Sequence, residues 1–341
     1  MMDNSNDKKT ATAVGDLFMV GLPGLVLDDS TVSLVRDCRI HNFILFKRNV
    51  ADPEQLRQLC GELNALCREH GLPLPLISID QEGGTVARLG PPFTQFADAR
   101  QLAESSDPEV AVREYATVCA RELREVGINM NLAPVLDVCP AGEGRFMERR
   151  SLGSDPAQVG VLGCLIIDVL QEAGVAACVK HFPGLGAAVL DPHLQLPTVT
   201  QSRQQLQEVD LTPFRAAAQA GVAAFMTSHT IYSAIDADHP ATLSALILEG
   251  LLRREIGYDG LVITDDLEMG AIENDGTVAE AAFASFLAGA DLLLICHDHE
   301  KIRQSHARLL AGVTSGAVSG ARLDASRRRI ASVQGRYCES A

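Results

Sequence analysis

Short apolar runs and longer amphipathic segments alternate along the whole chain. The eight apolar runs are nearly continuous, as expected for strands that are buried on both faces. They lie at 16–22, 43–48, 75–80, 128–138, 175–182, 223–229, 261–267 and 291–297. We therefore predict eight buried strands, beginning with DLFMVGL and ending with DLLLICH.

The segments between these runs have the residue spacing of amphipathic helices. Residues 53–71 carry apolar side chains three and four positions apart and end at Gly71, a residue type that often terminates helices. Residues 107–127 open with Asp107 and Pro108, an N-cap followed by a first-turn proline. Further helices of this kind are predicted at 157–174 and 278–290.

Strict alternation of strands and helices predicts a parallel sheet. Eight such units favour an α/β fold of the closed (β/α)8 TIM-barrel type over an open doubly wound sheet. No G-x-G-x-x-G sequence follows the first run, which argues against a dinucleotide-binding fold. We predict a single barrel domain over 13–341, preceded by a flexible polar tail over 1–12.

Composition and charge narrow the possible partners. Of the 341 residues, 47% are hydrophobic and 21% are charged, which is typical of a globular protein. The chain has 29 Lys and Arg against 44 Asp and Glu, a net charge of −15. A surface this acidic repels nucleic-acid phosphates and anionic lipids, so we expect neither as a partner. No uncharged apolar run reaches about 18 residues, so no membrane span is predicted.

The cysteines indicate a reducing environment. There are nine, an odd number, without any C-x-x-C pair, and most lie inside apolar stretches. The first residues lack the apolar core of a secretory signal. The sequence therefore predicts free, buried thiols in a cytoplasmic protein.

Polar and charged side chains follow several of the predicted strands. In (β/α)8 barrels the carboxyl ends of the strands form the active site. Burying a charge in an apolar run is costly without a partner, and one structural ion pair does not account for a whole set of such residues. The set therefore favours an active site. Its members are Asp80, Lys180, His181, His229, Asp265 and Asp266.

Two pairs of residues in these loops have the chemistry of catalysis. Asp191 and His193 are two apart in the D-x-H sequence, so both side chains lie on one side of an extended segment. A carboxylate beside an imidazole suits a general acid/base, although an exposed loop histidine with a chance neighbour has the same pattern. Asp265 and Asp266 face opposite sides of a strand, and spacing alone does not choose between them.

Two other polar groups are interpreted without a catalytic role. The sequence His297-Asp298-His299 resembles a metal-binding pair, but it follows the last strand and is interpreted as a solvated loop. The basic run over 327–329 is interpreted as the solvated end of a helix, where positive charge is favoured by the helix dipole.

Five motifs in order resemble the family 3 glycoside hydrolases, and most closely their single-domain bacterial β-N-acetylhexosaminidases. The motifs cover roughly 80–270, while the strand pattern covers nearly the whole chain. Leu185 differs from the histidine that is frequent in the third motif, and Pro192 replaces a serine in the fourth. The motifs are IDQEGG (79–84), RRSLGSDP (149–156), KHFPGLG (180–186), DPH (191–193) and ITDDLEM (263–269).

The resemblance implies a role for each matching residue. Asp265 would be the catalytic nucleophile, and His193 the acid/base with Asp191 as its partner. Most glycosidases use two carboxyl groups for these tasks. An ordinary aspartate (pKa ~4) and an ordinary histidine (pKa ~6.5) provide an ionised nucleophile and a protonated acid at one pH. No metal or organic cofactor is implied. The implied substrate-binding residues are Asp80, Arg88, Arg150, Lys180, His181 and His229.

The function implied is that of a retaining exo-β-N-acetylglucosaminidase. Its substrate would be a small carbohydrate, namely anhydro-muramyl disaccharides or muropeptides in peptidoglycan recycling. Three alternatives stay open: a related β-glycosidase or phosphorylase, a non-catalytic sugar-binding barrel, and a Schiff-base lyase that uses Lys180.

Overall fold

The computed structural model describes residues 4–188, 195–274 and 276–338. Eight parallel strands form its central sheet, and each overlaps one of the predicted apolar runs. They are β1 (Phe18–Gly21), β2 (Asn42–Leu45), β3 (Ile77–Ile79), β6 (Met130–Asn131), β7 (Ala176–Phe182), β9 (Ala224–Thr227), β12 (Leu261–Ile263) and β13 (Leu293–Ile295). Their order in the sheet is β12-β9-β7-β6-β3-β2-β1-β13.

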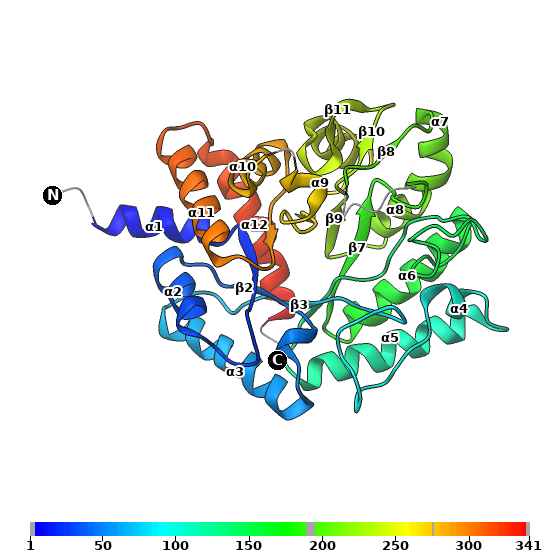
Figure 1. The fold of residues 1–341 in the computed structure, drawn as a ribbon, viewed down its shortest axis with the longest axis horizontal. Helices are drawn as coiled ribbons and strands as arrows, with labels where there is room; N and C mark the ends of the chain where they lie inside the picture. Colours follow the sequence, from blue (N-terminus) through cyan, green and yellow to red (C-terminus); the bar gives the residue numbers. More distant parts are fainter. Residues whose placement is uncertain (1–3, 189–194, 275, 339–341) are drawn as a thin grey trace.

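The two edge strands of this sheet meet and close the barrel. A parallel bridge joins Ile263 to Leu292, and the Thr264 N–H donates to the Leu292 carbonyl at 3.0 Å. The Thr264 hydroxyl oxygen also accepts from the Leu294 N–H at 2.9 Å. The predicted (β/α)8 barrel is therefore confirmed, with its helices arranged around the strands (Figure 1).

Helices follow the strands and cover the outside of the barrel. The N-cap expected at Asp107 is present, since its side chain accepts from the Val110 N–H, and Asp52 caps α3 in the same way by accepting from the Glu54 and Gln55 N–H groups. The covering segments are α2 (Asp29–Cys38), α3 (Pro53–Glu69), α5 (Pro108–Glu125), α6 (Pro156–Glu172), α8 (Leu211–Gln219), the π-type helical segment η4 (Leu246–Glu255), α10 (Val278–Ala288) and α11 (His299–Thr314).

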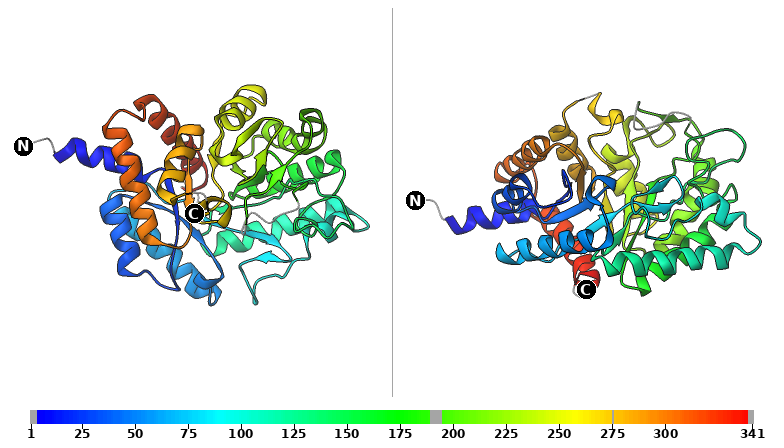
Figure 2. Two further views of the ribbon diagram at one scale, coloured as in Figure 1. Left: turned by 45° about the horizontal axis from the view of Figure 1, so that its top comes forward. Right: turned by 60° about the horizontal axis from the view of Figure 1, so that its bottom comes forward.

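The first helix begins in the N-terminal segment, and the flexible tail over 1–12 stays a prediction. Helix α1 (Asn4–Gly15) projects from one side of the barrel and ends against it (Figure 2). Its last turn is anchored, because Ala13 and Val14 are buried and the Thr12 hydroxyl accepts from Arg39 Nε at 3.2 Å. The polar composition of this segment gave no signal for these tertiary contacts.

Short elements extend the barrel beyond the carboxyl ends of its strands. Strand β4 (Gln81–Gly83) follows β3 directly and pairs with β5 (Val86–Ala87). A three-stranded sheet joins β8 (Thr198–Val199), β10 (Ile231–Tyr232) and β11 (Asp236–Pro240). The short helices in the connecting segments are α4 (Ala99–Ala103), α7 (Arg203–Gln205) and α9 (Gly270–Glu273).

The last helix, α12 (Gly320–Tyr337), crosses the opposite end of the barrel. The Gln334 amide donates to Asn42 Oδ1 at 3.0 Å, at the start of β2. Just past the helix, the Cys338 thiol donates to the Pro75 carbonyl at 3.2 Å, before β3. The helix therefore covers the amino ends of several strands and leaves their carboxyl ends free for a site.

Two arginines of this helix correct the interpretation of 327–329 as a solvated helix end, which holds only for the exposed Arg328. Arg327 pairs with Asp16 at 2.7 Å, and Arg329 pairs with the fully buried Asp291 at 3.2 Å. Asp291 also pairs with Arg253 at 2.7 Å and with Arg322 at 3.2 Å. Three guanidinium groups therefore surround one buried carboxylate, and the arginines fasten the helix to the barrel.

None of the helices in the described ranges combines the length and the apolar composition that crossing a bilayer requires.

Candidate active site

Charged side chains from two neighbouring regions meet at the carboxyl end of the barrel. Asp80 follows β3, Glu82 lies in β4, and Lys180 lies in β7. Lys180 Nζ is 2.7 Å from Asp80 Oδ1 and 2.7 Å from Glu82 Oε1. The ammonium group is only 3% exposed, so it bridges two carboxylates away from bulk water.

Two arginines complete this ion cluster. Arg150 binds Glu82 through two parallel hydrogen bonds of 2.9 and 2.7 Å, a geometry that fixes both groups in one plane. Arg88 donates to Asp80 Oδ2 at 3.0 Å. Three cations thus face two carboxylates, so the cluster carries one excess positive charge. The structure brings together Asp80, Arg88, Arg150 and Lys180, as the sequence predicted.

Charge pairing sets the protonation of this cluster. Burial alone raises the pKa of Asp80 and Glu82, but the nearby cations outweigh it. The Lys180 and Arg150 charges bring the pKa of Glu82 to about 2, and Lys180 and Arg88 hold that of Asp80 well below its usual range. Burial lowers the pKa of Lys180, but Asp80 and Glu82 raise it above its ordinary value. A Schiff-base lyase needs a neutral amine, so this geometry argues against that alternative.

His181 lies next to this cluster and is held by a buried carboxylate. Its Nδ1 is 2.7 Å from Asp137 Oδ2, and its Nε2 is 3.5 Å from Arg150 Nη2. Asp137 Oδ1 accepts from the Leu185 N–H at 2.6 Å, and the His181 N–H contacts both oxygens at 3.2 Å. Asp137 therefore orients both the imidazole and the start of the following loop.

Replacing Asp137 with Asn is expected to lower kcat/KM about ten- to hundredfold, because small displacements of positioning groups have effects of this size. In Asp137 each carboxylate oxygen accepts from a different N–H group. The side-chain amide of the variant has only one oxygen, so either His181 or the Leu185 N–H loses its acceptor. Steady-state kinetics would check this, with a melting curve to show that the variant is folded. A variant with unchanged kcat/KM would contradict the positioning role.

His229 follows β9 and is fully buried. Its Nδ1 is 2.8 Å from the Thr242 hydroxyl, and its Nε2 is 2.9 Å from the Asp266 carbonyl. The imidazole therefore connects β9 to the segment after β12 that holds both adjacent aspartates. Its predicted role in substrate binding stays a prediction.

The structure separates the two adjacent aspartates. Asp266 turns away to accept from the Glu268 N–H at 3.1 Å, and its other oxygen is 3.5 Å from His297 Nε2. Burial raises the pKa of Asp266 to about 7, and the neighbouring Glu268 and Asp265 charges add to this. The carboxylate of Asp265 accepts from the N–H of Asp266 at 2.8 Å.

Asp265 lies at the same end of the barrel as the ion cluster. It follows β12, as Asp80 follows β3, so both residues stand at the carboxyl ends of their strands. Asp265 is half-buried. The Asp266 side chain contacts Glu268 and His297, which leaves Asp265 as the candidate of the two aspartates for chemistry at this end.

Glu268 organises the loop after β13. Its carboxylate accepts from the N–H groups of Cys296 at 2.9 Å and Asp298 at 3.0 Å. His297 and Asp298 are exposed, as expected for a solvated loop, but Asp298 also caps α11. His299 differs from that interpretation, because it begins α11 and is 2.6 Å from the Ser30 hydroxyl. Among the described residues no three His, Cys, Asp or Glu side chains are grouped as metal ligands.

The predicted acid/base pair, Asp191 and His193, lies outside the described residues. Its role and its distance from Asp265 therefore stay predictions. Just before it, Leu185 and Ala188 are buried. Sequence reasoning gave no role to Glu82 or Asp137, although a carboxylate near the end of an apolar run was a signal for both.

A second buried carboxylate lies beside the loop that follows β7. Asp210 is 1% exposed, and neither of its oxygens has a hydrogen-bond partner in the structure as described. It contacts the loop at Gly184, where an added Cβ would lie 2.6 Å from the Asp210 Cβ. Burial, aided by the charge of Asp137, raises the pKa of Asp210 to about 7.

Asp210 is expected to make the protein less stable as the pH rises. In the folded protein Asp210 keeps its proton up to about pH 7, whereas in the unfolded chain it loses that proton near pH ~4. The free energy of unfolding therefore falls as the pH rises between these two values. Asp210→Asn should therefore raise the melting temperature at pH 8 and change it little at pH 5. Exposed Asp168, replaced by Asn, is the control. Equal shifts at both pH values would contradict this assignment.

Comparison with known proteins identifies the family. The model of the glycosyl hydrolase family 3 N-terminal domain matches residues 10–333. A protein of Thiobacillus denitrificans named Beta-hexosaminidase is 37% identical over 296 residues, which are 85% of this chain and 81% of that protein. A protein of Alkalilimnicola ehrlichii with the same name is 38% identical, over 83% of this chain and 81% of that protein. The chain belongs to glycosyl hydrolase family 3.

Solved structures agree with this assignment. The family 3 β-N-acetylglucosaminidase of a Paenibacillus species superposes with a TM-score of 0.92 at 41% identity, covering 97% of this chain. This chain spans 63% of the length of that protein. The β-N-acetylhexosaminidase of Beutenbergia cavernae superposes with a TM-score of 0.88 at 28% identity, over 96% of this chain and 98% of that one. The protein described here is a glycoside hydrolase.

Proposed function

We propose that this protein is a retaining exo-β-N-acetylglucosaminidase that forms a covalent glycosyl-enzyme on Asp265. The observation that carries the proposal is the position of Asp265 just after β12, at the same end of the barrel as the buried cluster around Lys180. The names of the similar proteins support the choice of an N-acetylated hexose as the terminal sugar.

The cluster has the chemistry to bind a sugar. Arg88, Lys180 and Arg150 are donors only, whereas Asp80 accepts, so together they match the hydroxyl and carbonyl groups of a pyranose ring. Their mutual ion pairs fix these groups before substrate arrives, which lowers the ordering cost of binding. Because the cluster is largely buried, it suits a chain end better than the middle of a polysaccharide.

In the proposed reaction, Asp265 attacks the anomeric carbon while His193 protonates the leaving oxygen. The bond from the sugar to the leaving group breaks as the bond to the Asp265 carboxylate forms. His193, oriented by Asp191, then takes a proton from a water molecule whose oxygen attacks the anomeric carbon. The bond between that carbon and the Asp265 carboxylate breaks, and the sugar is released with its β configuration.

The proposal is tested by hydrolysis of 4-nitrophenyl N-acetyl-β-glucosaminide, with the matching β-glucoside as control. We expect release from the acetamido substrate only. Comparable release from the glucoside would instead support a related β-glycosidase. If neither substrate is hydrolysed and the protein still binds N-acetylglucosamine saturably, the result would support a non-catalytic sugar-binding barrel.

Water is proposed as the acceptor rather than phosphate. Product analysis with and without inorganic phosphate distinguishes the two, because phosphorolysis would yield a sugar 1-phosphate. We expect free N-acetylglucosamine in both conditions. A phosphate-dependent rate with sugar phosphate as the main product would show a phosphorylase.

We further propose that the natural substrates are anhydro-muramyl disaccharides or muropeptides, in cytoplasmic recycling of peptidoglycan. The resemblance to the single-domain bacterial enzymes supports the substrate. All nine cysteines are free and eight are buried, which supports a reducing compartment. Digestion of purified muropeptides, followed by mass spectrometry, should show loss of one N-acetylglucosamine. Intact muropeptides under conditions that cleave the 4-nitrophenyl substrate would contradict this part of the proposal.

A further inference from the structure

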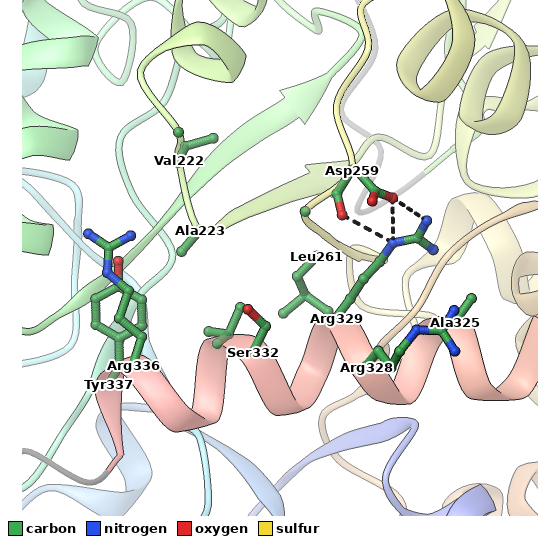
Figure 3. Close-up of a pocket in the computed structure, with 13 residues that line it drawn as sticks. Val222, Ala223, Asp259, Leu261, Ala325, Arg328, Arg329, Ser332, Arg336 and Tyr337 are labelled. Atoms are coloured by element: carbon green, nitrogen blue, oxygen red, sulfur yellow. Dashed lines mark hydrogen bonds and ion pairs between the residues drawn. The ribbon is translucent and has the colours of Figure 1, made fainter.

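A pocket of about 360 Å³ lies at the end of the barrel opposite the catalytic carboxylates (Figure 3). Helix α12 forms one wall, and the segments that lead into β9 and β12 form the other. Because these segments precede their strands, whereas Asp265 follows β12, the pocket is separate from the candidate active site.

Two arginines at this pocket have no ion pair among the described residues. Arg322, Arg327 and Arg329 of the same helix are paired with carboxylates in the barrel. Arg328 and Arg336, which also line the pocket, are exposed and have no such partner. They are eight positions apart, or about 12 Å along the helix axis, so both long side chains can reach one bound molecule.

The rest of the lining adds hydrogen-bonding groups and a net positive charge. Ser332 lies midway between the two arginines on the helix. Arg329 rises toward Asp259 and binds its carboxylate (Figure 3). Three arginines therefore face one acidic side chain, in a protein whose net charge is −15.

A buried hydroxyl at the same pocket lacks a partner. Tyr337 lines the pocket and is 1% exposed, and no hydrogen-bond partner of its hydroxyl is found in the described structure. The Arg336 guanidinium lies 5.1 Å from the centre of its ring, and both side chains rise from the helix on the side of Val222 and Ala223 (Figure 3). An unpaired buried hydroxyl is costly, so a bound acceptor would be favoured here.

We propose that this pocket binds a small phosphate-bearing molecule through Arg328 and Arg336. Guanidinium groups match the oxygens of phosphate with parallel hydrogen bonds. The volume exceeds that of one phosphate ion and suits a molecule the size of a sugar phosphate or diphosphate. A ligand that binds the folded protein and not the unfolded chain stabilises the folded state. This ligand would do so from a pocket that is separate from the candidate active site.

Calorimetric titration with pyrophosphate at constant ionic strength tests the proposal. We expect saturable binding to one site. Arg328→Gln/Arg336→Gln should weaken it at least about tenfold, because each lost charged contact contributes a factor of that order. The matched control is Arg113→Gln/Arg121→Gln, which removes two exposed arginines at the same spacing on α5 and should leave affinity unchanged.

Two further variants sharpen the test. Asp259→Asn removes the acidic group that competes for Arg329, so it should tighten binding, the opposite sign to loss of the arginines. Tyr337→Phe removes the hydroxyl that would donate to the ligand, so it should also weaken binding. The proposal is overturned by heat without saturation, or by equal affinity in the Arg328→Gln/Arg336→Gln variant and its control. Tighter binding of citrate than of pyrophosphate would overturn the assignment to phosphate.

Discussion

Asp265→Asn is expected to reduce kcat for 4-nitrophenyl N-acetyl-β-glucosaminide at least about a thousandfold, because an amide oxygen is a poor nucleophile at the anomeric carbon. The side chain keeps its size, and its oxygen can still accept from the Asp266 N–H. The fold should therefore survive, and KM should change less than kcat. Initial rates measured over a range of substrate concentrations check both quantities.

The adjacent Asp266 supplies the matched control. Asp266→Asn removes a carboxyl group of the same size one position away, but this side chain faces His297 and Glu268. Its backbone carbonyl, which contacts His229 Nε2, is unchanged by the substitution. We expect a loss of less than about tenfold in kcat, typical of a group that does not react. Equal losses in the two variants would contradict the assignment of Asp265 as the nucleophile.

Lys180→Met is expected to destabilise the fold by about 3–5 kcal/mol and to abolish activity, because the buried carboxylates of Asp80 and Glu82 both lose the cation that bridges them. Lys180 is 3% exposed and is 2.7 Å from both Asp80 and Glu82. Arg88 and Arg150 each stay bound to one carboxylate, but the net charge of the cluster falls from one positive charge to zero. Denaturant unfolding of the variant and the wild type measures the loss.

A double substitution separates the buried charge from simple loss of packing. In Lys180→Met/Asp80→Asn, the remaining pair, Glu82 and Arg150, is complete and hydrogen-bonded. We expect much of the lost stability to return, with no return of activity. If the double variant is no more stable than Lys180→Met, the loss in Lys180→Met does not come from buried carboxylates that lack their shared cation.

The fold was accessible from the sequence because its signals are local. Eight apolar runs mark strands whose two faces are both buried, and residues such as Asp52 and Asp107 mark helix starts by bonding to nearby N–H groups. Arg327 and Arg329 were misread for the opposite reason. Their partners, Asp16 and Asp291, are distant in the sequence, so nothing in the basic run itself indicates burial.

The candidate site was predictable in composition but not in geometry. The charged residues near the carboxyl ends of β3 and β7 had to lie at the same end of a barrel, and Asp80 and Lys180 are in contact. Spacing could not show that Asp137 holds His181, because that contact needs the backbone of two different strands. Nor could it choose between Asp265 and Asp266, whose side chains diverge only after the strand ends.

The most direct test of the account is to trap the glycosyl-enzyme. The enzyme is incubated with a fluorinated N-acetylglucosaminyl fluoride whose covalent intermediate turns over slowly, and its peptides are then mapped by mass spectrometry. We expect one sugar attached to the carboxylate of Asp265, and no labelling of Asp265→Asn. A sugar on another residue, or release of the α-configured product without any adduct, would contradict it.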